Sequence, residues 1–120
     1  MKILILDDLQ EIRDILKELL EDCGHTIEMF SSPIYAFKEI KDFNQFDIII
    51  SDFEMPDMNG LEFLGELRGI NQIRPFILFS SMILELKEFD FSKVTRTFQK
   101  YEVTELVSFI NMLEDHSKVA

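Results

Sequence analysis

Several residues that could do chemistry stand directly after apolar runs of this chain. Asp7 and Asp8 close the first such run, Asp52 closes another, and Ser80 and Lys100 follow later ones. Carboxylates serve proteins as nucleophiles, as ligands for hard cations or as caps of loops. Which of these roles Asp52 takes depends on the side chains beside it, and therefore on the secondary structure that carries them.

The stretch around Asp52 predicts a buried strand that runs into a loop. The β-branched run Ile48–Ile50 lacks the alternation of a half-buried strand and is typical of a parallel strand covered on both faces. The segment Met55–Gly60 contains proline, aspartate, asparagine and glycine, which favour a loop. We therefore expect Asp52 at the carboxyl end of a central strand, where open α/β sheets bind their ligands.

Similar patterns along the chain predict strands that alternate with helices. Apolar runs predict further strands at 2–6, 26–30, 75–81 and, as a more polar edge strand, 94–99. Apolar residues at helical spacing predict helices over 12–20, 33–43, 60–69 and 106–113, with a polar tail after about residue 114 that frays. Residues 82–91 fit neither period, so we expect a short or irregular fourth helix there. The alternation predicts one α/β domain, residues 1–120, with a doubly wound five-stranded parallel sheet.

The composition excludes several classes of function. The chain has 120 residues and a net charge of −11, whereas nucleic acids and anionic membranes attract a surplus of lysine and arginine. Its single cysteine, Cys23, allows no internal disulfide, and no apolar run has the length of a signal peptide or a membrane span. We therefore expect a cytoplasmic domain that by itself binds neither nucleic acid nor a membrane.

The predicted fold brings the acidic residues together. The first and third strands of a doubly wound sheet are neighbours, so Asp7, Asp8 and Asp52 converge. Two carboxylates about 4 Å apart repel each other by roughly 4 kcal/mol at an effective dielectric constant near 20, and Mg²⁺, which prefers oxygen ligands, relieves this repulsion. With Ser80 as a hydrogen-bond donor and Lys100 as a cation, such a cluster can accept a phosphoryl group on a carboxylate.

These residues resemble those of the receiver domain of response regulators in two-component signalling. The resemblance rests on the Asp7–Asp8 pair, the Asp-x-x-Met-Pro-x-Met-x-Gly segment from Asp52 to Gly60, Ser80 and Lys100, and it covers nearly the whole chain. It implies the flavodoxin-like strand order 2-1-3-4-5, which is the known order of that fold. It also implies a domain that is no enzyme beyond catalysing its own phosphorylation and dephosphorylation.

The resemblance further implies the ligands of a metal ion beside the phosphoacceptor. Asp52 accepts the phosphoryl group in this interpretation. Asp8 and Asp52 bind Mg²⁺ directly, Asp7 acts mainly through a metal-bound water, and the backbone carbonyl of Glu54 is a further ligand.

The other implied roles concern the phosphoryl group and the partners. Ser80 holds a phosphoryl oxygen and Lys100 pairs with it. The donor is a phosphohistidine on a sensor histidine kinase or a histidine phosphotransfer protein. An output protein, which the sequence does not identify, reads the changed surface, and homodimerisation is left open.

The last third of the chain departs from the family pattern. Tyr101 stands where receivers usually have proline, Thr97 stands where they commonly have an aromatic switch residue, and residues 92–94 replace a Gly-Ala pair. The segment between Ser80 and Lys100 is also shorter than usual. These departures leave a second interpretation, a degenerate receiver that serves as an interaction or dimerisation module without phosphate. A third, a Mg²⁺-dependent hydrolase with turnover, finds no substrate pocket or second acid–base residue in the sequence.

The remaining polar and apolar candidates have simpler interpretations. We expect His25 and His116 to take no part in the chemistry, and Asp57 to be a turn residue. Strand parity favours Ser80 over Ser81 as the hydroxyl of the site. The apolar residues within 82–91 are expected to be mostly core, and any that are exposed are candidates for a partner-binding patch.

Overall fold

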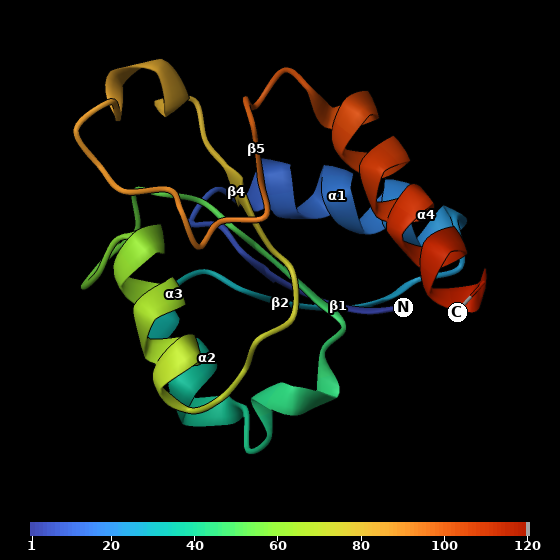
Figure 1. Cartoon of the computed structure of the whole chain (residues 1–120), viewed down its shortest axis with the longest axis horizontal. Coiled ribbons are helices and arrows are strands. Elements are labelled where there is room, and N and C mark those ends of the chain that lie inside the picture. Colours follow the sequence, from blue (N-terminus) through green and yellow to red (C-terminus); the bar gives the residue numbers. More distant parts are fainter. Residues whose placement is uncertain (120) are drawn as a thin grey trace.

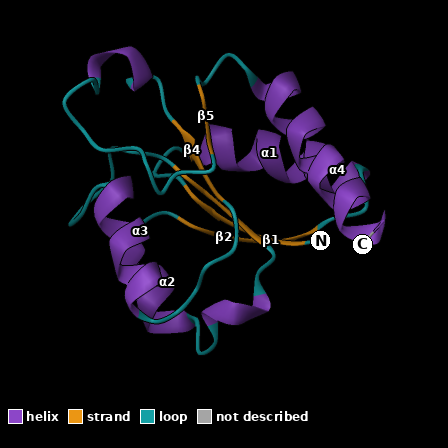
Figure 2. Cartoon of the chain, in the orientation of Figure 1, coloured by secondary structure: helices purple, strands orange, loops and turns teal. Residues whose placement is uncertain are grey.

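A computed structural model describes residues 1–119 of the chain, without the side chains of Leu84 and residues 117–119. The five strands are parallel and lie in the order β2-β1-β3-β4-β5, which confirms the predicted doubly wound fold. The sheet runs through the middle of the molecule (Figure 1, Figure 2). Its strands are β1 (Lys2–Leu6), β2 (Thr26–Phe30), β3 (Ile48–Ser51), β4 (Phe76–Phe79) and β5 (Arg96–Phe98).

Helices cover both faces of the sheet. They are α1 (Gln10–Asp22), α2 (Pro33–Glu39), α3 (Gly60–Gly69) and α4 (Val103–Val119). Helices α1 and α4 lie on one side, α2 and α3 on the other (Figure 1). Alternate residues of β3 therefore enter different clusters: Ile48 and Ile50 pack with α1 and α4, while Ile49 packs with α2 and α3. None of the described helices is both long and apolar enough to span a bilayer.

Helix α2 ends earlier than the periodicity predicted. It stops at Glu39, because Asp42 begins a separate 3-10 turn (Phe43–Gln45) by accepting a hydrogen bond from the backbone N–H of Asn44 at 2.9 Å. Phe43 is buried, as expected of a core residue, but it reaches the core from this turn. Apolar spacing alone could not show the break.

Helix α4 extends past the predicted end at 113 into the polar tail and continues through Val119. Glu114 in this extension accepts a hydrogen bond from the amino group of Met1 at 2.9 Å and lies 3.3 Å from Nδ1 of His25. The His25 ring is buried, and its Nε2 lies 2.9 Å from Oδ1 of Asn111. His25 thus links the start of β2 to α4, which is a structural role.

The segment between β4 and β5 contains little regular structure. The short helix expected at 82–91 is a 3-10 turn, Ile83–Glu85, and β5 is two residues shorter at its amino end and one shorter at its carboxyl end than the predicted 94–99. Leu86 is buried in the core on the α2–α3 side, with Phe91 and Val94 packed against it. Side-chain burial, rather than a helix, holds this segment against the sheet.

Candidate functional site at the carboxyl ends of β1 and β3

Register places the acidic residues side by side. Leu6 of β1 pairs with Ser51 of β3, so the residues that follow them, Asp7 and Asp52, leave the sheet at neighbouring points. Asp7, Asp8 and Asp52 each offer a carboxylate oxygen, and these oxygens lie within 4.8 Å of one another. The convergence predicted from the sequence is therefore present in the structure.

Asp7 is held from several directions. It is almost fully buried, its Oδ1 accepts a hydrogen bond from the backbone N–H of Leu9 at 3.0 Å, and its Oδ2 forms an ion pair with Nζ of Lys100. Arg13 of α1 donates a hydrogen bond to the carbonyl oxygen of Asp7 at 2.7 Å. Asp8, next in the chain, is exposed. The β1–α1 connection thus fixes one carboxylate inside and presents the other to solvent.

Asp52 is buried at the floor of the cluster. It is 8% exposed, its Oδ1 accepts a hydrogen bond from the backbone N–H of Phe53 at 2.8 Å, and its Oδ2 lies 3.7 Å from Nζ of Lys100. Burial raises the pKa of Asp52 to about 6, with Asp7 and Asp8 contributing in the same direction and Lys100 and the Phe53 amide opposing them. A cation that binds to this carboxylate, or a reaction that consumes its negative charge, therefore lowers the free-energy cost of burying it.

The loop after β3 is folded tightly back on the strand end. The backbone N–H of Gly60 donates to the carbonyl oxygen of Phe53 at 2.7 Å. A Cβ at Gly60 would collide with the carbonyl oxygen of Asp52 and come within 2.8 Å of Cδ1 of Leu78. Asp57 has a positive φ of 76°, which fits its predicted role as a turn residue. Residue 60 must be glycine because the backbone of Asp52 and the side chain of Leu78 leave no room for a Cβ there.

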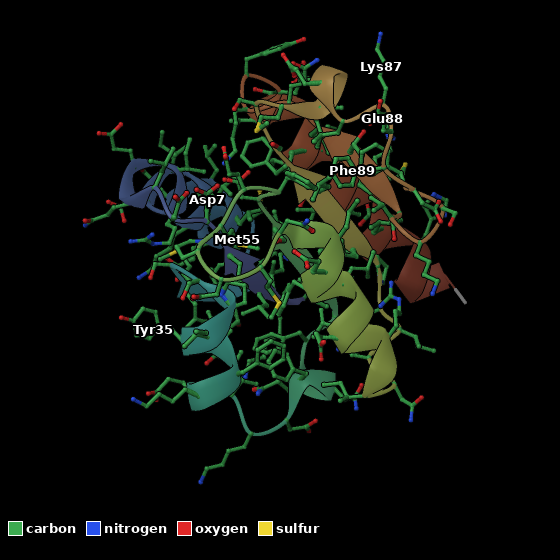
Figure 3. The ribbon with its side chains drawn as sticks, turned by 90° about the vertical axis from the view of Figure 1, so that its left-hand side faces the viewer. Asp7, Tyr35, Met55, Lys87, Glu88 and Phe89 are labelled. Carbon is green, nitrogen blue, oxygen red and sulfur yellow. The ribbon has the colours of Figure 1, made fainter. Side chains whose placement is uncertain are left out.

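Ser80 completes the wall of a small cavity above Asp52. The cavity has a volume of about 260 Å³ and is lined by Asp8, Leu9, Asp52, Glu54, Ser80, Ser81 and Met82. Ser80 is 1% exposed and its Oγ accepts a hydrogen bond from the backbone N–H of Met82 at 3.1 Å, whereas Ser81 is exposed. This burial supports the choice of Ser80. A view from the side shows Asp7 and Met55 near this end of the sheet (Figure 3).

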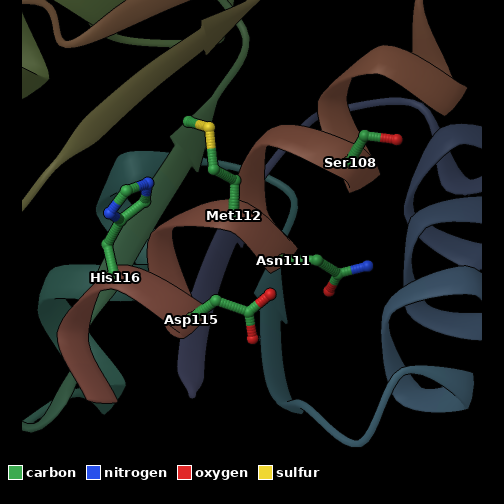
Figure 4. A pocket seen from close by; sticks show the side chains of 5 residues that line it. All are labelled: Ser108, Asn111, Met112, Asp115 and His116. Atoms are coloured by element: carbon green, nitrogen blue, oxygen red, sulfur yellow. The ribbon is translucent and has the colours of Figure 1, made fainter. Parts of the chain in front are cut away.

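A larger hollow, about 460 Å³, lies elsewhere. All the side chains that line it come from α4, and they project around one stretch of the helix (Figure 4). They are Ser108, Asn111, Met112, Asp115 and His116. A groove along a single helix lacks the converging charges of the carboxylate cluster, so the smaller cavity is the better candidate for chemistry.

Some residues of the site could not be found in the sequence. Leu9 and Met82 line the cavity, Arg13 supports the Asp7 carbonyl, and Phe53 donates its amide to Asp52. Leu9 and Phe53 directly follow predicted site residues, and that adjacency is the one available signal. Nothing in the spacing of Arg13 within an amphipathic helix marks it as a neighbour of the site.

Comparison with known proteins agrees with this geometry. The family model described as the response regulator receiver domain matches residues 3–96. The two-component response regulator ARR12 of Arabidopsis thaliana is 35% identical over 82 residues, which are 68% of this chain and 14% of that protein. Chemotaxis protein CheY-3 of Vibrio cholerae is 33% identical over 75 residues, 62% of this chain and 57% of that protein. The chain thus spans only part of the length of these relatives.

Solved structures give the same result. A CheY-like receiver domain protein from Methanospirillum hungatei matches with a TM-score of 0.82 at 25% identity, over 99% of this chain and 98% of that one. The response regulator TrrA from Thermotoga maritima, in complex with Mg²⁺ and BeF, matches with a TM-score of 0.79 at 29% identity, over 93% and 97% of the two chains. Since the family model also covers well over half of the sequence, the chain belongs to the response regulator receiver domain family.

Proposed function

We propose that this domain accepts a phosphoryl group on Asp52 from a phosphohistidine donor and thereby switches a protein-interaction surface. The observation that carries the proposal is the cavity in which the buried Asp52 carboxylate lies 3.7 Å from Lys100, with Ser80 and Asp8 in the same wall. A nucleophile and a hydroxyl that line one small cavity, with a cation 3.7 Å from the nucleophile, suit the transfer of an anionic group.

The donor set fits a hard divalent cation. Three carboxylates offer oxygens within 4.8 Å of one another, and oxygen is the ligand that Mg²⁺ prefers. Asp8 and Asp52 would bind Mg²⁺ directly, Asp7 would act through water, and the Glu54 carbonyl would complete the set. When bound, Mg²⁺ offsets the negative charge of the cluster and of the incoming phosphoryl oxygens.

The residues of the chain divide the transfer among them. A carboxylate oxygen of Asp52 attacks phosphorus, and the P–N bond to the donor imidazole breaks with its electron pair passing to that nitrogen. A proton already on the other ring nitrogen, or one that the released nitrogen takes up from solvent, leaves the donor histidine neutral. The product is an aspartyl phosphate. Lys100 pairs with a phosphoryl oxygen, and the hydroxyl of Ser80 donates to another. Attack of water on phosphorus breaks the O–P bond, returns the Asp52 carboxylate and releases inorganic phosphate, so the domain acts on its own phosphoryl group.

The partners follow from this chemistry. The donor is a sensor histidine kinase or a histidine phosphotransfer protein, and the relatives above that are named two-component response regulators support that class. The output partner recognises the surface changed by the added charge of nearly two units. Because the chain spans 14% of the plant regulator, output functions of whole relatives do not transfer to it.

Intact-mass measurement after incubation with Mg²⁺ and acetyl phosphate tests the proposal. We expect one added phosphoryl group on the parent and none on Asp52→Asn. Asp57→Asn is the matched control, because Asp57 is an exposed aspartate in the adjoining loop and should not alter the adduct. If the parent shows neither an adduct nor a beryllofluoride complex although Mg²⁺ binds, the proposal is wrong and the domain is a phosphate-independent interaction module.

A further inference from the structure

Phe53 connects the candidate phosphoacceptor to the segment between β4 and β5. It directly follows Asp52, and its backbone is fixed on both sides, because the N–H donates to Oδ1 of Asp52 at 2.8 Å and the carbonyl accepts from Gly60 at 2.7 Å. Phe53 is 8% exposed. A change at the Asp52 carboxylate therefore acts directly on the backbone of Phe53, as it does on the neighbouring Lys100.

The ring of Phe53 rests on an aromatic residue of the irregular segment. Phe89 packs edge-on against it, with ring centroids 5.0 Å apart and an interplanar angle of 68°. Phe89 is 45% exposed, and it lies on the side of the molecule seen in Figure 3, where Lys87 extends outward beside it. The pair thus joins the buried site to a surface position in one contact.

The segment that carries Phe89 is anchored in the core by Leu86, Phe91 and Val94, while the turn around Phe89 itself has few hydrogen bonds. The backbone N–H of Phe89 donates to the carbonyl of Leu86 at 3.1 Å, and Asp90 accepts from the N–H of Ser92 at 2.9 Å. Leu86 is buried, but residues 87, 88 and 90 are exposed. These turns lie outside the sheet. Among the described ring pairs, Phe89 contacts only Phe53, so this contact is the aromatic anchor of the exposed turn.

No equivalent aromatic contact runs through β5 in the part of the chain that the structure describes. Thr97 has no ring, and Phe98 faces α4, where it packs against Phe109 at 5.8 Å. Among the described ring pairs, an aromatic path from Asp52 to the surface is present only at Phe53 and Phe89.

We propose that Phe89 is a positioning residue for Asp52 that acts through Phe53, and that phosphorylation of Asp52 in turn releases Phe89. The proposal rests on the phosphorylation proposed above. In the unmodified site the Phe53 amide donates to a charged carboxylate; in an aspartyl phosphate that oxygen is the neutral carbonyl of an ester-like group, so the hydrogen bond weakens. The contact between the Phe53 and Phe89 rings holds Phe53 in the position from which its amide reaches Asp52. This ring contact, called the stack below, therefore favours the unmodified site.

Linkage gives the proposal two consequences that different measurements report. If phosphorylation weakens the stack, then removing the stack must favour phosphorylation by the same factor. The strength of an aromatic pair limits this factor to about two- to tenfold. Beryllofluoride with Mg²⁺ serves as the probe, since it occupies the phosphoryl position without being hydrolysed.

Fluorescence reports the first consequence. The chain contains no tryptophan, so Phe89→Trp introduces a single tryptophan at the contact, which can be excited selectively over the two tyrosines. We expect its emission to shift toward that of an exposed indole when beryllofluoride and Mg²⁺ are added. Ile73→Trp, exposed in the loop before β4 at the opposite end of the sheet, is the control and should not respond. Unchanged emission from the Phe89→Trp variant, in a sample that binds the probe, overturns the proposal.

Affinity reports the second consequence. Phe89→Ala should bind beryllofluoride about two- to tenfold more tightly than the parent, and Phe89→Tyr, which keeps the ring, should restore parental affinity. Phe91→Ala, a ring of the same segment that forms no described ring pair with Phe53, should leave the affinity unchanged. Phe89→Leu replaces Phe89→Ala if the smaller side chain unfolds the domain. Equal beryllofluoride affinities in the parent and all variants overturn the coupling between Phe89 and Asp52 but leave the proposed function intact. Failure of the parent to bind beryllofluoride overturns the proposed function as well.

Discussion

At the scale of single residues, the surroundings of Asp52 disfavour its ionised form. Asp52 is buried beside Asp7 and Asp8, and its pKa is about 6 rather than 3.8. Below about pH 4 the carboxyl is protonated in the folded and the unfolded chain, so it costs nothing. As the pH rises from about 4 to 6 the unfolded chain ionises first, so the folded state loses stability progressively, and above about pH 6 the cost is complete.

This cost predicts that Asp52→Asn stabilises the protein near neutrality. We expect its free energy of unfolding at about pH 7 and without metal to exceed that of the parent by about 1 to 2 kcal/mol, allowing for solvent at the mouth of the cavity. The difference should vanish below about pH 4. Urea unfolding across this range measures it, and a difference that is constant with pH would contradict the role of ionisation.

Lys100 is expected to have the opposite effect on stability. Its removal in Lys100→Met leaves the buried Asp7 without its ion-pair partner and should lower the free energy of unfolding by about 2 kcal/mol. Because Lys100 lowers the pKa of Asp52, the variant should also raise that pKa, which an NMR titration of the carboxyl carbon would detect. Lys93→Met, an exposed lysine beyond the site, should change neither quantity.

Glu54 is predicted to set the lifetime of the phosphorylated state. Its exposed carboxylate lines the cavity two residues beyond Asp52, where it can repel or orient water. Glu54→Asn should change the rate of self-dephosphorylation severalfold, followed as the decay of the phosphorylated mass. Glu66→Gln, an exposed residue of α3, is the comparison. A decay rate equal to that of the parent would remove Glu54 from the mechanism.

At the scale of elements, the loop between β3 and α3 depends on a single glycine. Gly60 begins α3 and lies against the carbonyl of Asp52, so Gly60→Ala forces the loop away from the strand end. We expect a loss of about 2 to 3 kcal/mol in the free energy of unfolding, measured in urea, and a slower phosphorylation.

Gly65→Ala is the matched control for that substitution. Gly65 lies in the same helix with no other atom within 4 Å of its added Cβ. Alanine there should therefore stabilise the domain by about 0.5 to 1 kcal/mol. If both variants lose stability equally, the close approach at Gly60 is not the cause of the loss.

Elements with strong local signals were predicted well. Strands β1 and β2 and helix α3 have the predicted bounds, because an apolar run or a Gly-bounded helical stripe is decided by neighbouring residues. The end of α2, the extension of α4 and residues 86–95 were not predicted correctly. Those depend on a local cap at Asp42, on contacts of Glu114 with the amino terminus, and on the burial of Leu86, none of which a periodicity records.

At the scale of the whole molecule, strand order made the site predictable. Once β1 and β3 are neighbours, residues far apart in sequence meet without further information, as Asp7 and Asp52 do. The contacts of Arg13 with Asp7 and of Phe89 with Phe53 need the relative placement of a helix or an irregular segment on the sheet. Sequence patterns indicate the edge at which the site forms, and tertiary packing decides what surrounds it.

The short edge strand β5 is the strand that we expect to open most easily, and its opening affects the site because Lys100 follows it. β5 has three residues and, in the described part of the chain, pairs only with β4, so we expect its local opening to require less free energy than global unfolding. We expect its amides to exchange with deuterium earlier than those of the central β1 and β3, and Asp7→Asn, which removes one anchor of Lys100, to accelerate that exchange further. Such an opening would carry Lys100, which follows β5, away from Asp7 and Asp52 while the rest of the sheet stays closed. The negative charge of the carboxylates would then be exposed to an arriving cation by a local fluctuation of the edge strand.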